Sequence, residues 1–268
     1  MALAAADAER GAVLAGLGGC LACHTADSGQ PGAGGHRIKT PYGTFVGSNI
    51  TPDPLHGLGT WSLADFDRAM RKGKSPDGRA YWPAFPWPSF SELTDEDVDD
   101  LWAWVQSLEP SARPDEPHEL ERGYRGRLKA GLWRTFVHRQ REVLPDDESW
   151  SEEVRRGAYL VNTLGHCGGC HSPRTRLGRE DATRRLAGGD TPPYRAPNLT
   201  PHADGLATWT DDDWSSFLEM GMLPDGDFTG RGMARVVNEG TSLLTTEDRE
   251  AMAAYLRQLT PHPDAEPE

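Results

Sequence analysis

Two five-residue segments use every cysteine of this 268-residue chain in one pattern. They are Cys20-Leu21-Ala22-Cys23-His24 and Cys167-Gly168-Gly169-Cys170-His171. Two thiols separated by two residues can form thioethers with the two vinyl groups of one porphyrin, and the histidine that follows can ligate the iron. A redox-active dithiol or half of a zinc site is the alternative, but neither requires that histidine or predicts it twice. The pattern predicts two covalently bound c-type haems, with His24 and His171 as iron ligands.

The two motifs lie in opposite halves of the chain, and the halves resemble each other beyond the motifs. The matching pairs are Arg10-Gly11-Ala12 and Arg156-Gly157-Ala158, Asn49-Ile50-Thr51-Pro52 and Asn198-Leu199-Thr200-Pro201, Thr60-Trp61-Ser62 and Thr208-Trp209-Thr210, and Leu93-Thr94 and Leu244-Thr245. Matches in the same order over about a hundred residues indicate two copies of one fold. We therefore predict a haem domain over residues 1–110, a linker over 111–150 and a second haem domain over 151–268.

Each copy has the pattern of a short series of helices. The expected helices cover residues 9–17, 65–71 and 94–109 in the first copy and residues 153–164, 212–220 and 245–260 in the second. Ser62 and Thr210 are suitable N-caps for the middle helices, and Gly73 and Gly221 are suitable C-terminal stops. Strand patterns are nearly absent. We predict an all-α protein, with two tandem cytochrome c domains joined by a helical linker.

The linker has a different composition from the two copies. Leu128, Leu132, Trp133, Phe136 and Val137 recur at helical spacing, with arginine and lysine between them. We expect an amphipathic helix that packs its apolar stripe against one or both haem domains. A docking surface for a partner subunit or for lipid headgroups is the alternative.

Composition and charge restrict the partners and the location. Hydrophobic residues make up 37% of the chain, which is modest for two cores unless a large apolar cofactor fills part of them. The net charge of −13 argues against binding to nucleic acid or to an anionic membrane surface, and no run of about 18 to 20 apolar residues is long enough to span a bilayer. Because bacteria attach haem c outside the cytoplasmic membrane, we expect a periplasmic protein, soluble or held at the membrane through a partner.

Several segments resemble the cytochrome c subunits of bacterial periplasmic dehydrogenases that act on alcohols, gluconate or aldehydes, or that contain molybdenum hydroxylases. The segments that carry the resemblance are residues 49–53 (Asn-Ile-Thr-Pro-Asp), 61–71, 81–90 (Tyr-Trp-Pro-Ala-Phe-Pro-Trp-Pro-Ser-Phe), 164–174 and 196–201. The resemblance implies a subunit that accepts single electrons from a dehydrogenase partner and passes them toward a quinone, an oxidase or another acceptor. It implies no catalytic residues in this chain.

The sixth ligand of each iron is predicted separately. The resemblance places a distal methionine at Met233, and a thioether packed against the porphyrin is the alternative role of that residue; Met220 and Met222 are weaker candidates. In the first copy the corresponding loop of some relatives carries methionine where this chain has Phe85, which cannot ligate iron. Met70 is our leading substitute. A histidine, His36 or His56, or an open iron position is the alternative.

Four further residues repeat between the copies and are candidates for the haem pockets. Trp61 and Trp209 can donate an indole N–H, and Asn49 and Asn198 can donate an amide N–H, to a haem propionate. A core aromatic and a cap are the competing roles.

An enzyme is the alternative function. A first haem without a strong sixth ligand could act on peroxide or oxidise a small substrate, and Phe85 is the one feature that favours this. No acid and base residues of the kind a peroxidase requires are evident around the loop.

Overall fold

The chain divides into two units, Met1–Phe136 and Val137–Glu268. The structure is a computed structural model, and it describes residues 6–122, 131–132, 135, 147–176, 178–191 and 194–265. Each unit is described by itself below. The domain limits at residues 110 and 150 stay a prediction.

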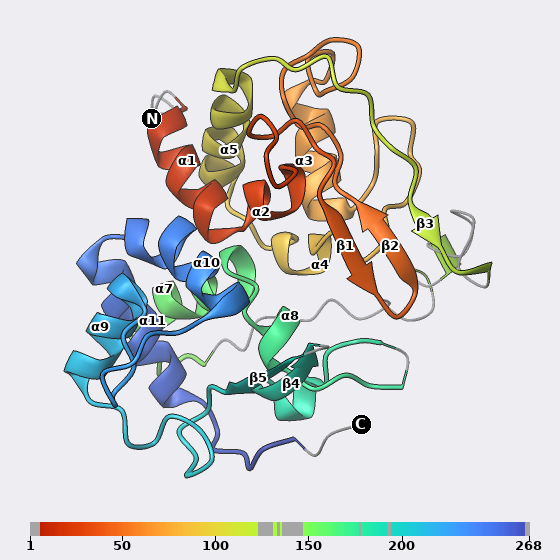
Figure 1. The fold of residues 1–268 in the computed structure, drawn as a ribbon. Helices are drawn as coiled ribbons and strands as arrows, with labels where there is room; N and C mark the ends of the chain where they lie inside the picture. The colour runs from red at the N-terminus through yellow and green to blue at the C-terminus, as the bar shows by residue number, and fades with distance from the viewer. Residues whose placement is uncertain are drawn as a thin grey trace. The chain divides into compact units, whose positions relative to one another are not determined.

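The first unit combines short helices with a small sheet (Figure 1). Its helices are α1 (Ala8–Leu17), α2 (Cys20–His24), α3 (Leu63–Lys72), α4 (Trp87–Phe90) and α5 (Asp95–Ser107). Its strands are β1 (Arg37–Thr40), β2 (Gly43–Val46) and β3 (Glu119–Leu120), in the order β1-β2-β3 with antiparallel pairing. α1 packs against α5, and this crossing buries Leu14 and Leu17 of α1 with Leu101 and Trp104 of α5.

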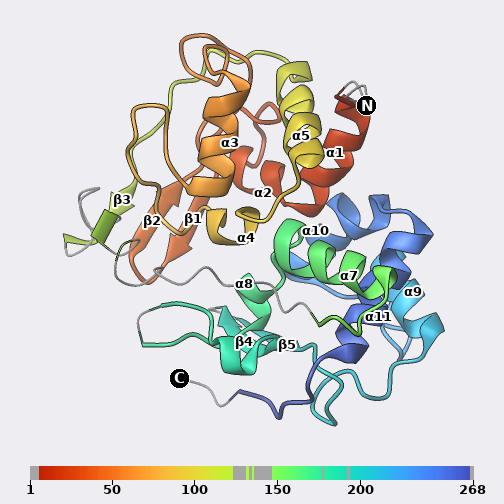
Figure 2. The ribbon, with the colours of Figure 1, turned by 180° about the vertical axis from the view of Figure 1, so that it is seen from behind.

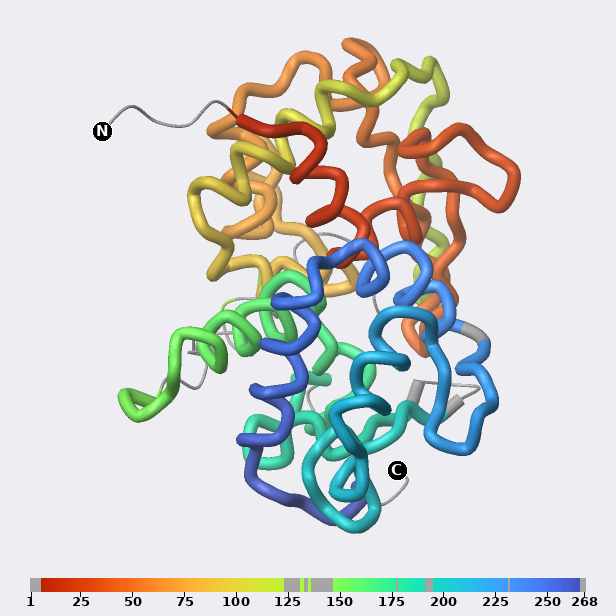
Figure 3. The backbone as a smooth tube through the Cα atoms, turned by 90° about the vertical axis from the view of Figure 1, so that its left-hand side faces the viewer, coloured from red at the N-terminus to blue at the C-terminus, as the bar shows by residue number. Residues whose placement is uncertain are grey.

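The second unit repeats this plan with additions (Figure 2). Its helical elements are α7 (Glu152–Tyr159), the π-helix η2 (Leu160–Leu164), α8 (Gly168–His171), the 3₁₀ turn η3 (Ala182–Arg184), α9 (Asp211–Met220), α10 (Arg231–Glu239), the 3₁₀ turn η4 (Thr241–Leu243) and α11 (Thr246–Gln258). β4 (Ala187–Thr191) and β5 (Tyr194–Asn198) form an antiparallel pair. α7 packs against α11, as α1 packs against α5 in the first unit (Figure 3).

A glycine allows the close helix crossing in each unit and explains the repeated Arg-Gly-Ala. A Cβ atom on Gly11 would lie 2.0 Å from the carbonyl oxygen of Asp100, and one on Gly157 would lie 1.8 Å from that of Ala251. Any larger residue would force the helices apart, because a backbone carbonyl cannot move aside as a flexible side chain can. The glycine is therefore part of the repeated core.

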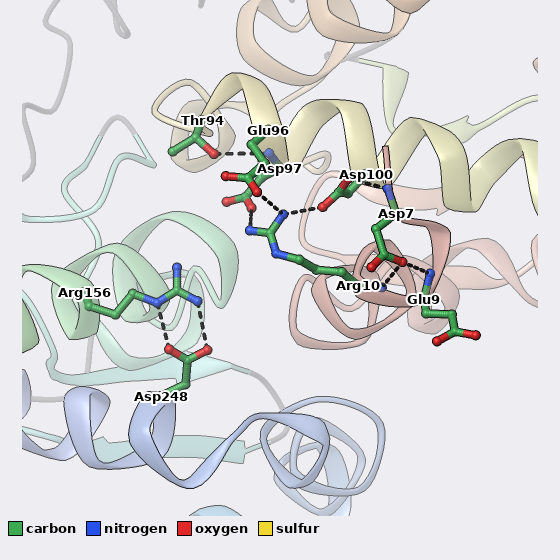
Figure 4. Close-up of polar contacts among 9 residues, drawn as sticks. All are labelled: Asp7, Glu9, Arg10, Thr94, Glu96, Asp97, Asp100, Arg156 and Asp248. Atoms are coloured by element: carbon green, nitrogen blue, oxygen red, sulfur yellow. Dashed lines mark hydrogen bonds and ion pairs between the residues drawn. The ribbon is translucent and has the colours of Figure 1, made fainter. Parts of the chain in front are cut away.

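The arginine before each glycine joins the same two helices through carboxylates (Figure 4). Arg10 of α1 donates to Asp97 and Asp100 of α5, both buried. Arg156 of α7 makes a two-pronged ion pair with Asp248 of α11, with N···O distances of 2.7 and 2.8 Å. In both units a guanidinium thus lies near the start of the last helix. Carboxylates in the first turn of a helix are also stabilised by the helix dipole.

The caps predicted for the middle helices are confirmed. Ser62 and Thr210 each accept a hydrogen bond from a backbone N–H three residues on, and the aspartate there bonds back, which makes a capping box at the start of α3 and of α9. Gly73 and Gly221 end these helices with φ of 53° and 77°, in the left-handed region that glycine tolerates best.

The all-α prediction is wrong. The structure is mixed, with 43% helix, 11% strand and two antiparallel sheets. The missed strands are short. β1 and β2 are joined by Pro41 and Tyr42, and β2 begins at Gly43, so the sequence of this segment resembles a proline- and glycine-containing loop. Such strands carry too few alternating residues to stand out from sequence alone.

The predicted linker helix falls mostly outside the described residues, as do Leu128, Trp133, Phe136 and Val137. Gly131 and Leu132 are helical, and the Leu132 side chain is exposed. Among the described helices, none is both long and apolar enough to cross a bilayer.

Candidate functional site

A single turn of helix brings the first pair of cysteines and its histidine together. Gly19, with φ of 63°, turns the chain out of α1 and into α2, which contains the whole motif. Residues three and four apart lie on one side of a helix, so Cys20, Cys23 and His24 share a side of α2. This spacing lets two thiols and one imidazole of a single turn reach one flat cofactor.

The second motif is built in the same way, but a residue with a side chain takes the place of the glycine. His166 occupies the place of Gly19 and takes a positive φ of 35°, which is unusual for a residue with a side chain. α8 then carries Cys170 and His171, with Cys167 at its N-cap. Sequence analysis did not single out His166, although its alignment with Gly19 in the repeat would have indicated the strain.

The two histidines of the motifs are oriented by equivalent hydrogen bonds. His24 Nδ1 lies 2.7 Å from the carbonyl oxygen of Ser48, and His171 Nδ1 lies 2.8 Å from that of Pro197. A carbonyl can only accept, so each Nδ1 carries the proton and each Nε2 keeps its lone pair for a metal. Burial lowers the pKa of both imidazoles, which favours the neutral form that ligates iron.

The state of the cysteines argues against a redox-active dithiol. Burial raises the pKa of Cys20 and of Cys167 to about 12, so these thiols stay protonated at neutral pH. A redox-active dithiol requires the opposite shift, toward thiolate. None of the four cysteines forms a disulfide, and the described residues contain no group of three or more His, Cys, Asp or Glu that could hold a metal ion.

Close backbone packing fixes the first motif in place. A Cβ atom on Gly47 would lie 1.8 Å from the carbonyl oxygen of Cys23, so the segment that supplies the Ser48 carbonyl passes directly over the motif. Sequence reasoning found neither carbonyl partner of the histidines, because any residue type can supply a backbone carbonyl.

The side chains of the repeated asparagines form hydrogen bonds mainly with backbone groups. Asn49 accepts from the N–H and hydroxyl of Thr51 and donates to the carbonyls of Ser111 and Arg113. Asn198 accepts from Thr200 in the same way and donates to the carbonyl of His262, at 2.8 Å. Each asparagine thus ties the carbonyl-bearing loop to the chain that follows the last helix. A contact of either residue with a haem propionate stays a prediction.

The tryptophans of the repeat lie just before α3 and α9 and are half-buried. Trp209 makes edge contacts with Trp214, at 5.0 Å between ring centroids, and with Phe217, at 5.1 Å. The buried Nε1–H of Trp214 has no hydrogen-bond partner among the described residues, so it is a donor of the kind a propionate accepts. Sequence analysis missed Trp214. The role predicted for Trp61 and Trp209 stays a prediction.

The predicted sixth ligands lie on different elements of the two units. Met233 is half-buried on α10. Met70 is buried on α3, 7% exposed, and Leu218 holds the same position on α9. Met220 is 50% exposed, which fits a surface residue. The ligand role of Met233 and of Met70 stays a prediction.

These observations fit a covalently bound haem in each unit. Each motif offers two thiols and one imidazole, whose tautomer is fixed by a backbone carbonyl and whose neutral form is favoured by burial. The donor set is that of a c-type haem.

Comparison with known proteins gives the family. The cytochrome c family model matches residues 8–109 and 154–260, once in each unit. The chain therefore belongs to the cytochrome c family, and its cofactor is covalently bound haem c.

Its relatives include a diheme cytochrome and cytochrome subunits of dehydrogenases. A diheme cytochrome c-type protein of Cereibacter sphaeroides is 43% identical over 260 residues, which cover 94% of this chain and 86% of that protein. The cytochrome c subunit of a quinone alcohol dehydrogenase of Gluconobacter oxydans is 38% identical, with coverage of 96% and 55%. The cytochrome c subunit of a gluconate 2-dehydrogenase of Pantoea cypripedii is 35% identical, with coverage of 94% and 59%. The chain thus spans little more than half the length of these two dehydrogenase subunits.

Proposed function

We propose that this chain is a diheme cytochrome c that transfers single electrons between a dehydrogenase and a further acceptor. One haem c is held by Cys20, Cys23 and His24, and the other by Cys167, Cys170 and His171. The observation that carries the proposal is the pair of equivalent bonds from His24 and His171 to backbone carbonyls, each beside its own Cys-x-x-Cys turn.

The chain's own residues hold and shield the cofactor. When bound, haem c supplies one-electron cycling between ferric and ferrous iron. The cysteine sulfurs fix its edge, and the carbonyls of Ser48 and Pro197 keep each imidazole in one tautomer and orientation. The buried helix crossings around Gly11 and Gly157 give a rigid frame, which limits the reorganisation that accompanies a change of iron charge.

The donor we propose is a dehydrogenase. Several relatives are named as cytochrome subunits of alcohol, fructose and gluconate dehydrogenases. These names favour an electron-transfer subunit over the alternative of a haem enzyme. A quinone or an oxidase is the proposed acceptor. We also propose a periplasmic location, because covalent haem attachment in bacteria takes place there, and the net charge of −13 favours transient contact with a basic partner surface.

The test uses protein matured in a host that attaches haem c. We expect reduction by a quinone-dependent alcohol or gluconate dehydrogenase with its substrate, and reoxidation by a quinone analogue. Replacing both Cys20 and Cys23, or both Cys167 and Cys170, by alanine provides a matched pair of variants, since each should remove one haem and leave the other reducible. Wild-type protein that carries two haems but accepts no electrons from any dehydrogenase of these classes would contradict the proposal.

A further inference from the structure

The two units have matching backbone hydrogen bonds in the turn that follows the middle helix, α3 or α9. Gly73 and Gly221 end α3 and α9, and each carbonyl then accepts from the N–H eight residues on, Tyr81 at 2.9 Å and Thr229 at 2.8 Å. Isolated bridges join Lys74 to Ala80 and Met222 to Phe228 within the same turn. The register is therefore shared without a gap from the helix end to residues 81 and 229.

Phe85 and Met233 lie at the same distance along the chain after that shared turn. Both lie twelve residues after the glycine that ends the middle helix. A methionine thioether can ligate haem iron as the sixth ligand, whereas a phenyl ring cannot. The two residues therefore correspond by count, with Phe85 in the turn before α4 and Met233 in the first turn of α10, and they differ in ligand chemistry.

The ring of Phe85 is held among other aromatic rings. Its centroid lies 5.9 Å from that of Tyr81, edge to face, and 5.8 Å from that of Phe90, which is buried. No charged residue occurs from Tyr81 to Phe90. An apolar segment of this kind suits a small neutral ligand and offers nothing to balance an anion.

Met70 is explained by packing. It is the one described methionine of the first unit, and it lies eight residues after the N-cap Ser62, as Leu218 lies eight residues after Thr210. Leu218 is 4% exposed and Met70 is 7% exposed, so both fill the same core position. A site that leucine fills in one unit calls for an apolar side chain of that volume, and methionine meets this need.

We propose that the haem of the first unit is five-coordinate and binds a neutral diatomic ligand at its open iron position, whereas the haem of the second unit is closed by Met233. This inference rests on the proposed attachment of a haem at Cys20, Cys23 and His24. It assigns the first unit a ligand-binding site in addition to electron transfer. It also orders the two haems, since methionine ligation raises the reduction potential, and the first haem should be the one of lower potential.

The test is carbon monoxide binding to the dithionite-reduced holoprotein, followed by absorption spectroscopy. We expect about one CO per chain of two haems, and a ferric spectrum with one high-spin and one low-spin haem. Phe85→Met should abolish CO binding and convert the high-spin signal to low-spin. Phe85→Leu is the matched control, because leucine cannot ligate iron, and it should leave the CO stoichiometry unchanged.

Met70→Leu separates the proposal from ligation by Met70. We expect this variant to bind the same amount of CO as the wild type. Wild-type protein that binds no CO, or CO binding that persists in Phe85→Met, would overturn the inference. Haem content and reduction by a dehydrogenase are measured independently, so such a result would not contradict the proposed electron-transfer function. Wild-type protein without a haem at the first motif would contradict that function.

Discussion

The arginines that join the first and last helix of each unit offer a matched pair of substitutions (Figure 4). Arg10 contacts two carboxylates, and the side chains of Asp97 and Asp100 are only 1% and 5% exposed. The pair of Arg156 with Asp248 is more open, with side chains 37% and 20% exposed. Substitution by methionine keeps most of the apolar stem and removes the charge, so the two variants compare the same change in two settings.

The magnitudes follow from burial. Removing one partner of a buried ion pair costs about 3–5 kcal/mol, because the remaining charge is left without compensation. Arg10 itself is 34% exposed, and solvent screening reduces the expected loss for Arg10→Met to about 2–4 kcal/mol. For Arg156→Met, in the more exposed pair, we expect about 1 kcal/mol. The first substitution should therefore cost at least twice as much as the second.

Hydrogen exchange with mass spectrometry on the holoprotein measures each unit separately. Exchange of the α1 amides should accelerate roughly 30- to 1000-fold in Arg10→Met, and that of the α7 amides about fivefold in Arg156→Met. Glu96→Gln is the control: its carboxylate lies 3.9 Å from Arg10 and is 70% exposed, so exchange should hardly change. Equal effects of the two arginine substitutions, or unchanged exchange in α1, would refute the reasoning from burial.

Three further predictions concern the backbone and the caps. Gly157→Ala should lower the unfolding free energy by about 3 kcal/mol or more, measured as a fall in the melting temperature, because its Cβ would lie 1.8 Å from a carbonyl oxygen of α11; Gly232→Ala, with open space around it, should not. At His166, where φ is 35°, valine should leave the protein about 1–2 kcal/mol less stable than glycine does, by urea unfolding, and equal stability would contradict the strain. The pKa of Asp213 is lowered by hydrogen bonds from the side chain and then the backbone of Thr210. Its folded pKa is below the unfolded value of about 4, so its support of α9 is present above that value and is lost as the pH falls through the folded pKa; the difference in helix content between wild type and Asp213→Asn, followed by circular dichroism, should vanish in strong acid.

Sequence was sufficient for the helices whose ends are marked by side chains. The serine and glycine around the first middle helix predicted residues 65–71, and α3 covers Leu63–Lys72. The helix leading to the second motif was expected over residues 153–164 as one element, but it divides into α7 and a π-helix. No residue type in Leu160–Leu164 marks that change.

The remaining parts of the site depend on backbone groups and packing that residue types do not identify. The cysteines and histidines of both motifs were identified from spacing alone, and the structure gathers each set on one helical turn. The carbonyls of Ser48 and Pro197 could not be predicted, since every residue has one. Trp214 was missed because its unpaired N–H is a property of packing. The strands were missed because four- and five-residue strands with glycine and proline carry little periodicity.

We propose that each unit carries one covalently bound haem c. Intact-protein mass spectrometry, under denaturing conditions that remove any non-covalent cofactor, tests it most directly on protein matured in a competent host. We expect the polypeptide mass plus that of two haems, falling by one haem when Cys20 and Cys23, or Cys167 and Cys170, are both replaced by alanine. A wild-type mass with one haem or none would contradict it.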